Sequence, residues 1–176
     1  SLVRAGSESG KPNVMNRRKR AASELHPAPR STSVVVIGSY REDLAGLLAF
    51  CRSLVQLGLR VLHPPPQAYR IGEELGFVRL DSDCSLDQGQ VQRHVFTLLD
   101  SCDAVILYSP KGRVGVSAAL EIGYALHARK PIYATARPED VTVRALLSYE
   151  PSALTDFLRA ATAADELTEY AELPRT

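Results

Sequence analysis

A short run of β-branched residues at positions 33–38 constrains the fold more than any other feature of this sequence. It reads Ser-Val-Val-Val-Ile-Gly and lacks the alternation of apolar and polar residues that a strand with one solvated face shows. Such a run is typical of a central strand in a parallel sheet, because helices cover both faces of that sheet. The sequence therefore predicts an α/β protein.

Apolar runs and amphipathic segments alternate along the rest of the chain. The predicted strands are 59–63, 103–108 and 130–134, and the predicted helices are 44–55, 87–101, 116–128, 139–149 and 152–172. This alternation predicts a flavodoxin-like, or Rossmann-like, three-layer sandwich with a parallel sheet of four to five strands. Residues 67–84 carry no clear period, and we expect a lid or an active-site loop there.

The charge of the chain divides it into two parts. Residues 1–30 hold seven Lys and Arg against two Glu, a net charge of +5, and the remainder carries −4. We interpret 1–32 as a disordered basic leader and 33–176 as a single domain. Met15 is a candidate start, which would make 1–14 vector-derived. Only 6% of the residues are aromatic, which disfavours specific nucleic-acid binding, and no apolar run is long enough for a membrane span.

The cysteines and histidines indicate neither a disulfide framework nor a metal site. Cys51, Cys84 and Cys102 are odd in number and show no CxxC spacing, and Cys51 and Cys102 fall within apolar patterns. We expect buried free thiols and a cytoplasmic location. His63 and His94 belong to separate predicted elements, so the sequence predicts no metal and no cofactor.

In a parallel sheet, ligands bind beyond the carboxyl ends of the strands, which directs attention to 38–41, 63–66 and 109–117. The first of these segments reads Gly38-Ser39-Tyr40-Arg41. Glycine permits a close backbone approach, serine offers a hydroxyl group, and a helix N-terminus favours an anion. The alternative is a turn in which Ser39 only caps the helix.

Glu121 is the strongest candidate for chemistry. It is the only formally charged side chain between Arg113 and His127, and small and apolar residues surround it within a predicted helix whose N-terminus faces the cleft. In a pocket, such a carboxylate can act as a nucleophile or as an acid/base group. On the outer face of the helix it would simply be solvated.

Three segments carry a resemblance to a known family: 38–41, 101–105, and 115–125 (Gly-Val-Ser-Ala-Ala-Leu-Glu-Ile-Gly-Tyr-Ala) followed by Lys130-Pro131-Ile132-Tyr133. Together they resemble the nucleoside 2-deoxyribosyltransferase superfamily, which includes the nucleoside 5′-monophosphate N-glycosidases. The resemblance implies that Glu121 attacks the anomeric carbon of the sugar, that Tyr40 lies beside it, and that Ser39 and Ser117 bind sugar or phosphate. It also implies a homodimer.

The chain departs from the family pattern at two acids. Gly115 stands where the transferases carry Asp, and a second acid would fall near Val95, which cannot titrate. His94, Asp81 and Asp83 are the candidate proton donors to the departing base, although each can also be packed or solvated. Hydrolysis is therefore favoured over base transfer.

Three cations, Arg41, Lys111 and Arg113, lie near the predicted cleft mouth and can balance a phosphate, unless they are merely exposed. The leading hypothesis is an N-glycosidase that acts on a nucleoside 5′-monophosphate or a nucleoside. In this hypothesis Glu121, Tyr40 and His94 are catalytic, and the substrate-binding set is Gly38, Ser39, Arg41, Asp81, Asp83, Arg113, Gly115 and Ser117. The competing hypotheses are a nucleoside 2-deoxyribosyltransferase, a non-catalytic nucleotide-binding module and an NAD-glycohydrolase-like enzyme.

Overall fold

The computed structural model describes residues 31–74, 76–147 and 149–171, and the side chains of these ranges up to position 163. The elements in chain order are β1 (Ser33–Gly38), α2 (Tyr40–Gln56), β2 (Arg60–His63), β3 (Arg70–Glu74), β4 (Phe77–Leu80), a 3-10 turn (Asp81–Asp83), α3 (Gln88–Ser101), β5 (Ala104–Tyr108), α4 (Val116–His127), β6 (Ile132–Ala134), α5 (Val141–Leu147) and α6 (Ala153–Ala171). Of the expected leader 1–32, positions 1–30 lie outside the described residues.

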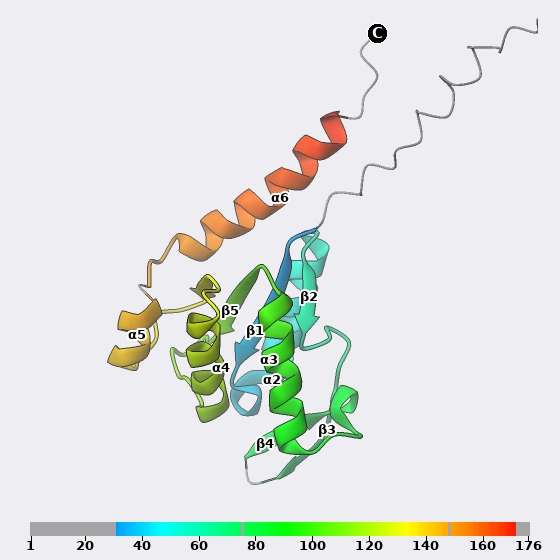
Figure 1. Ribbon diagram of the computed structural model, residues 1–176, viewed down its shortest axis with the longest axis vertical. Coiled ribbons are helices and arrows are strands. Elements are labelled where there is room, and N and C mark those ends of the chain that lie inside the picture. The colour runs from blue at the N-terminus through cyan, green and yellow to red at the C-terminus, as the bar shows by residue number, and fades with distance from the viewer. Residues whose placement is uncertain (1–30, 75, 148, 172–176) are drawn as a thin grey trace, which may run out of the picture. The chain divides into compact units, whose positions relative to one another are not determined.

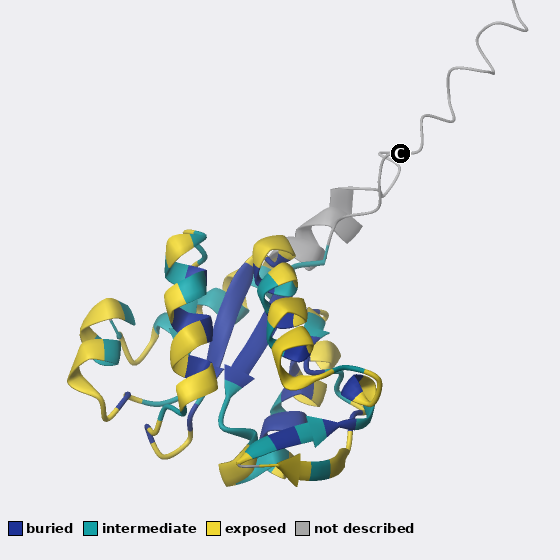
Figure 2. Cartoon of the chain, turned by 60° about the horizontal axis from the view of Figure 1, so that its bottom comes forward, coloured by how far each residue is buried: buried dark blue, intermediate teal, exposed yellow. Residues whose placement is uncertain are grey.

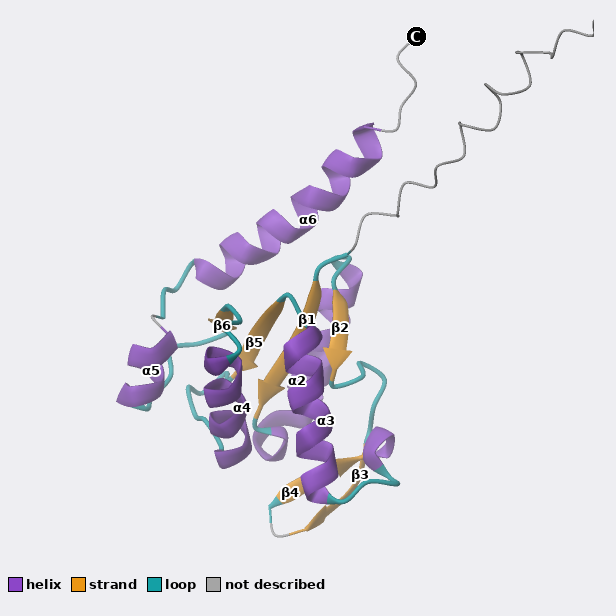
Figure 3. Cartoon of the chain, in the orientation of Figure 1, coloured by secondary structure: helices purple, strands orange, loops and turns teal. Residues whose placement is uncertain are grey.

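The main sheet has four strands, all parallel, in the order β2-β1-β5-β6 (Figure 3). This arrangement confirms the predicted α/β fold with a parallel sheet flanked by helices. The chain leaves β1 toward β2 on one side and returns at β5 on the other side. The strand order therefore reverses between β1 and β5, and a ligand site is expected beyond the carboxyl ends of these two strands.

Helices cover both faces of the sheet, which is why β1 is apolar at successive positions (Figures 1 and 2). Val34 and Val36 pack in a cluster with α2 and the first part of α6. Val35 and Ile37 point the other way and pack in a second cluster with α3 and α4. All four side chains are at most 1% exposed. A strand between two helical layers has no solvated face to alternate with.

Residues 70–74 and 77–80 pair as the antiparallel strands β3 and β4, where the sequence predicted a loop. Gly76 takes a φ of 85° at the turn, a conformation that favours glycine. Val78 and Leu80 of β4 are buried in the cluster around α2, whereas β3 is mostly exposed. With so few buried positions the hairpin produces no readable apolar period.

Hydrogen bonds to Asp43 shape the first turns of α2. Asp43 breaks the helical conformation after the first turn, and its carboxylate accepts hydrogen bonds from the Gly46 amide at 2.9 Å and the Tyr108 hydroxyl at 2.9 Å. Ser39 occupies the N-cap position but makes no side-chain capping bond. The Ser39 hydroxyl therefore does not cap the helix, contrary to the alternative interpretation.

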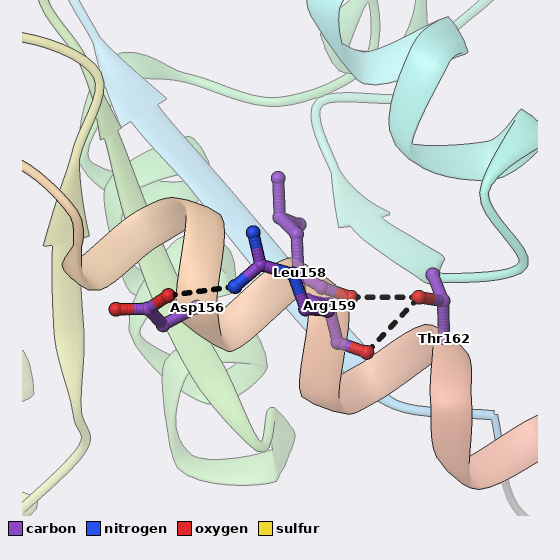
Figure 4. A network of polar contacts seen from close by, with 4 residues as sticks. All are labelled: Asp156, Leu158, Arg159 and Thr162. Carbon is purple, nitrogen blue, oxygen red and sulfur yellow. Dashed lines mark hydrogen bonds and ion pairs between the residues drawn. The ribbon is translucent and has the colours of Figure 1, made fainter.

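The first turns of α6 attach to the sheet through aromatic stacking. The rings of Phe157 and Tyr133 stack with their centroids 4.4 Å apart. On the same helix, Arg159 pairs with Asp156, and the Thr162 hydroxyl donates to the main-chain oxygens of Leu158 and Arg159 (Figure 4). Within the described residues, no helix is both long and apolar enough to cross a membrane.

Candidate active site

A cavity of about 620 Å³ opens at the carboxyl ends of β1 and β2. The reversal of strand order between β1 and β5 directed attention to the same edge of the sheet, one strand further along. Its walls come from the β1–α2 turn, the end of β2, the hairpin with the 3-10 turn, α3 and the N-terminal half of α4. This volume falls in the range that accommodates a small organic ligand. The cavity therefore joins segments spread from position 38 to position 121.

Glu121 reaches the cavity from the second turn of α4 and is only 9% exposed. The Gln92 side-chain amide, on α3, donates a hydrogen bond of 3.0 Å to its Oε1. Burial raises the pKa of Glu121 to about 7, against a smaller lowering by this hydrogen bond. A carboxylate that titrates near neutrality can be ionised at little cost when it has to attack.

Tyr40 and His63 form a hydrogen-bonded pair in the cavity wall, in which His63 is buried and Tyr40 is half-buried. The Tyr40 hydroxyl and His63 Nε2 are 2.8 Å apart. Burial, assisted by the charge of His94, lowers the pKa of His63 to about 4, so its imidazole is neutral at neutral pH. Burial and the charges of Glu121, Cys51 and Asp83 raise the pKa of Tyr40 well above its usual value. This pair therefore presents a neutral, fixed hydroxyl group to the cavity.

Asp83 is the second buried carboxylate of the site. It is 4% exposed, it lines the cavity from the 3-10 turn, and its Oδ1 accepts from the Ser82 hydroxyl at 3.2 Å. Arg79 lies close to it but donates to the main-chain oxygens of Asp83 and Leu86. The cavity thus contains two acids from different elements, one on α4 and one before α3.

The arginines at the mouth are held by acidic side chains. Arg41 lines the cavity with 70% of its side chain exposed, and its Nε lies 3.6 Å from Glu73. Arg113 lies 3.5 Å from Glu42 and 4.0 Å from Glu139 and does not line the cavity. Lys111 is exposed and also lies outside the lining. Of the three expected cations, one reaches the site.

The fold brings together most of the residues that the sequence singled out. The cavity is lined by Gly38, Ser39, Tyr40, Arg41, Asp83, Gly115, Ser117 and Glu121. Asp81 does not line it and instead accepts a hydrogen bond from the Tyr69 amide. His94 is exposed and lies outside the lining. Tyr40 and Glu121, the expected nucleophile, line the same cavity, and the Tyr40 hydroxyl is hydrogen-bonded to His63.

Sequence reasoning missed Gln92 and gave His63 only as part of the cleft-facing segment 63–66, without a role. His63 ends β2, so its place at the carboxyl edge of the sheet was readable, but its bond to Tyr40 was not. Gln92 gives no signal, because a glutamine near the start of a helix is usually solvated. Val95, which cannot titrate, also lines the cavity.

The described residues contain no group of three or more His, Cys, Asp or Glu side chains able to hold a metal ion. Cys51, Cys84 and Cys102 are free, and Cys51 and Cys102 are buried as predicted. The described part of the chain thus offers carboxylates, a tyrosine, a neutral histidine and amides to a ligand.

No family model matches the sequence, and no curated protein matches it. Among solved structures, the chain is similar to the CMP N-glycosidase BcmB of Clostridium botulinum, at 13% identity and a TM-score of 0.47. The match covers 73% of this chain and 96% of that chain. At this identity the similarity assigns no role to any residue described above.

Proposed function

We propose that this chain is an N-glycosidase that hydrolyses the bond between base and sugar in a nucleotide or nucleoside, with Glu121 as the nucleophile. The observation that carries the proposal is a buried carboxylate, oriented by an amide, that lines a cavity of about 620 Å³. Retaining glycoside cleavage requires such a carboxylate against the sugar. The family resemblance of residues 115–125 points to the same role.

In the first step, the ionised Glu121 attacks the anomeric carbon, and the bond from that carbon to the base nitrogen breaks. The electron pair of this bond leaves with the base, which takes up a proton if it was uncharged. Asp83, the second acid of the cavity, is the group we assign to that proton. Water then attacks the glycosyl-enzyme intermediate, releases the sugar and restores the Glu121 carboxylate.

The neighbours of Glu121 suit this role. The Gln92 amide holds Oε1, which leaves Oε2 for the attack. Tyr40 and His63 stay neutral and keep one wall fixed. Ser117 and the first amide groups of α4 lie at the cavity, where they can donate hydrogen bonds to sugar or phosphate oxygens.

The test is incubation of the full chain with a panel of ribo- and deoxyribonucleosides and their 5′-monophosphates, with free base measured by chromatography. We expect release of base with at least one member, and a loss of about 10³-fold or more in Glu121→Gln. The matched control is Glu139→Gln, which changes an acid outside the cavity and should retain the parent rate. A parent that binds nucleotides without releasing base would instead indicate a non-catalytic binding module.

Two further outcomes would assign a different reaction to the same cavity. Transfer of the sugar to an added second base, at a rate above hydrolysis, would identify a deoxyribosyltransferase. Release of nicotinamide from NAD alone would identify an NAD-glycohydrolase-like enzyme. The cytoplasmic location expected from the free cysteines stays a prediction.

A further inference from the structure

Two buried carboxylates line the cavity, and a cationic ligand would offset the cost of burying their negative charge. Glu121 and Asp83 are 9% and 4% exposed, and the charges of both act on the hydroxyl of Tyr40. Burial removes hydration from a carboxylate, and it raises the pKa of Glu121. A positive charge in the same cavity would offset part of this desolvation cost.

No basic side chain that the structure describes forms an ion pair with Glu121 or Asp83. Arg41 and Arg113 pair with Glu73 and with Glu42 and Glu139 at the mouth. Arg79 donates to main-chain oxygens of Asp83 and Leu86. His63 is neutral and hydrogen-bonded to Tyr40. Among the described residues, the carboxylate oxygens Asp83 Oδ2 and Glu121 Oε2 accept no hydrogen bond from a protein donor.

We propose that the substrate of this cavity is an N-glycoside whose base carries a positive charge at the time of binding, such as a pyridinium or N7-alkylated purine nucleoside. The cationic ring would lie between Glu121 and Asp83, with the aromatic side chains of Tyr40 and Phe77 on the cavity walls beside it. This inference rests on the proposed function and names the substrate class of that same site.

A cationic base also simplifies the chemistry. When Glu121 forms its bond to the anomeric carbon, the electron pair of the breaking bond stays on the ring nitrogen and cancels its positive charge. The base therefore leaves neutral, and no side chain has to give it a proton. Water then cleaves the glycosyl ester, and one proton goes to solvent. With a cationic base, neither Asp83 nor the Tyr40–His63 pair is required as a proton donor.

The first arm of the test measures binding alone, with 1-methylnicotinamide as the cationic probe and nicotinamide as its neutral counterpart. Calorimetric titration of the full chain should give a dissociation constant lower by about 10-fold or more for the cation. In Asp83→Asn this preference should shrink to about threefold or less. The control Asp156→Asn alters an exposed acid on α6 and should preserve it. Equal binding of both probes to the parent, or no binding of the cation, would overturn the inference even if Asp83→Asn does not fold.

The second arm measures cleavage of 7-methylguanosine and guanosine in a slightly acidic buffer, in which only the former is a cation. Each kcat/KM is divided by the uncatalysed rate constant of the same compound, because the methylated nucleoside is intrinsically more labile. We expect an enhancement greater by about 10-fold or more for the cation. Cleavage of both with equal enhancement contradicts the inference and leaves the proposed function standing. If the cation binds preferentially but no nucleoside is cleaved, the proposed function is contradicted, whereas the preference of the site for a cationic ligand still holds.

Discussion

Glu121 depends on one neighbouring side chain, Gln92, for its orientation and for part of its acidity. The hydrogen bond from Gln92 stabilises the ionised carboxylate, and burial opposes it. Since only the ionised form can attack, the rate of base release should rise with pH through about 7, the pKa of Glu121.

Gln92→Leu should shift this rise to higher pH by about one unit, because it removes the donor that lowers the pKa. The measurement is the pH dependence of kcat/KM with any cleaved nucleoside. Gln88→Leu, one turn earlier on the same helix, is the matched control and should keep the parent profile. A Gln92→Leu profile that loses rate equally at every pH would assign Gln92 a purely structural role.

The raised pKa of Glu121 also predicts how stability varies with pH. The folded chain holds a proton on Glu121 up to about pH 7, whereas the unfolded chain releases it near the usual value of 4.5. The folded state is therefore favoured at low pH, and this contribution is lost as pH rises from 4.5 to 7. The Glu121→Gln side chain cannot ionise, so the variant does not lose this stability as pH rises. Its free energy of unfolding should exceed that of the parent by up to about 3 kcal/mol at pH 8.

Urea unfolding of both proteins at pH 5 and pH 8 measures this effect. The difference in the free energy of unfolding between variant and parent should be larger at pH 8. The same difference at both values would mean that Glu121 is not desolvated in solution as it is in this structure.

Among the elements, α3 begins at a capping box whose two hydrogen bonds can be removed separately. The Asp87 carboxylate accepts from the Gln90 amide at 2.7 Å, and the Gln90 side chain accepts from the Asp87 amide at 2.8 Å. This cap sets the start of the helix that carries Gln92 into the site.

Asp87→Ala should lower the free energy of unfolding by about 1 kcal/mol, since it leaves the Gln90 amide without its partner. Chemical denaturation measures the loss. Gln90→Ala removes only the return bond and should cost less, and Gln88→Ala, at a position without a capping role, should cost least. An unchanged stability in Asp87→Ala would show that water replaces the cap.

Prediction from sequence succeeded at the elements that repeat an apolar pattern over many residues. The four strands of the sheet and helices α2, α3 and α4 lie where the patterns placed them, within one or two residues at most ends. The prediction of a loop at β3–β4 was wrong, because only Val78 and Leu80 of the nine described strand residues are buried and no apolar pattern results. A pattern that depends on burial disappears when an element buries almost nothing.

At the scale of the whole molecule, the homodimer implied by the family resemblance stays a prediction. Val116 and Leu120 are 82% and 56% exposed, and they lie one turn apart on α4 beside the cavity. We expect these side chains to be buried between two copies. Leu120→Asp should then convert a dimer into a monomer, whereas Val141→Asp, which changes an exposed apolar residue on α5, should not.

Light scattering coupled to gel filtration measures the mass directly. A monomeric parent at all concentrations tested would contradict the predicted dimer. A dimer that survives Leu120→Asp would place the contact elsewhere.

By itself, the sequence determined the strands of the main sheet and the helices that cover it, because apolar periodicity is a local property. It directed attention to the carboxyl edge of that sheet. It also singled out Glu121, whose charge stands alone among small residues. Only the tertiary structure decided that Gln92 holds Glu121, that His63 holds Tyr40, and that Asp83 rather than Asp81 lines the cavity. These pairings join segments far apart in the chain, and the desolvation that sets each pKa comes from every element packed around the cavity. No local pattern encodes either.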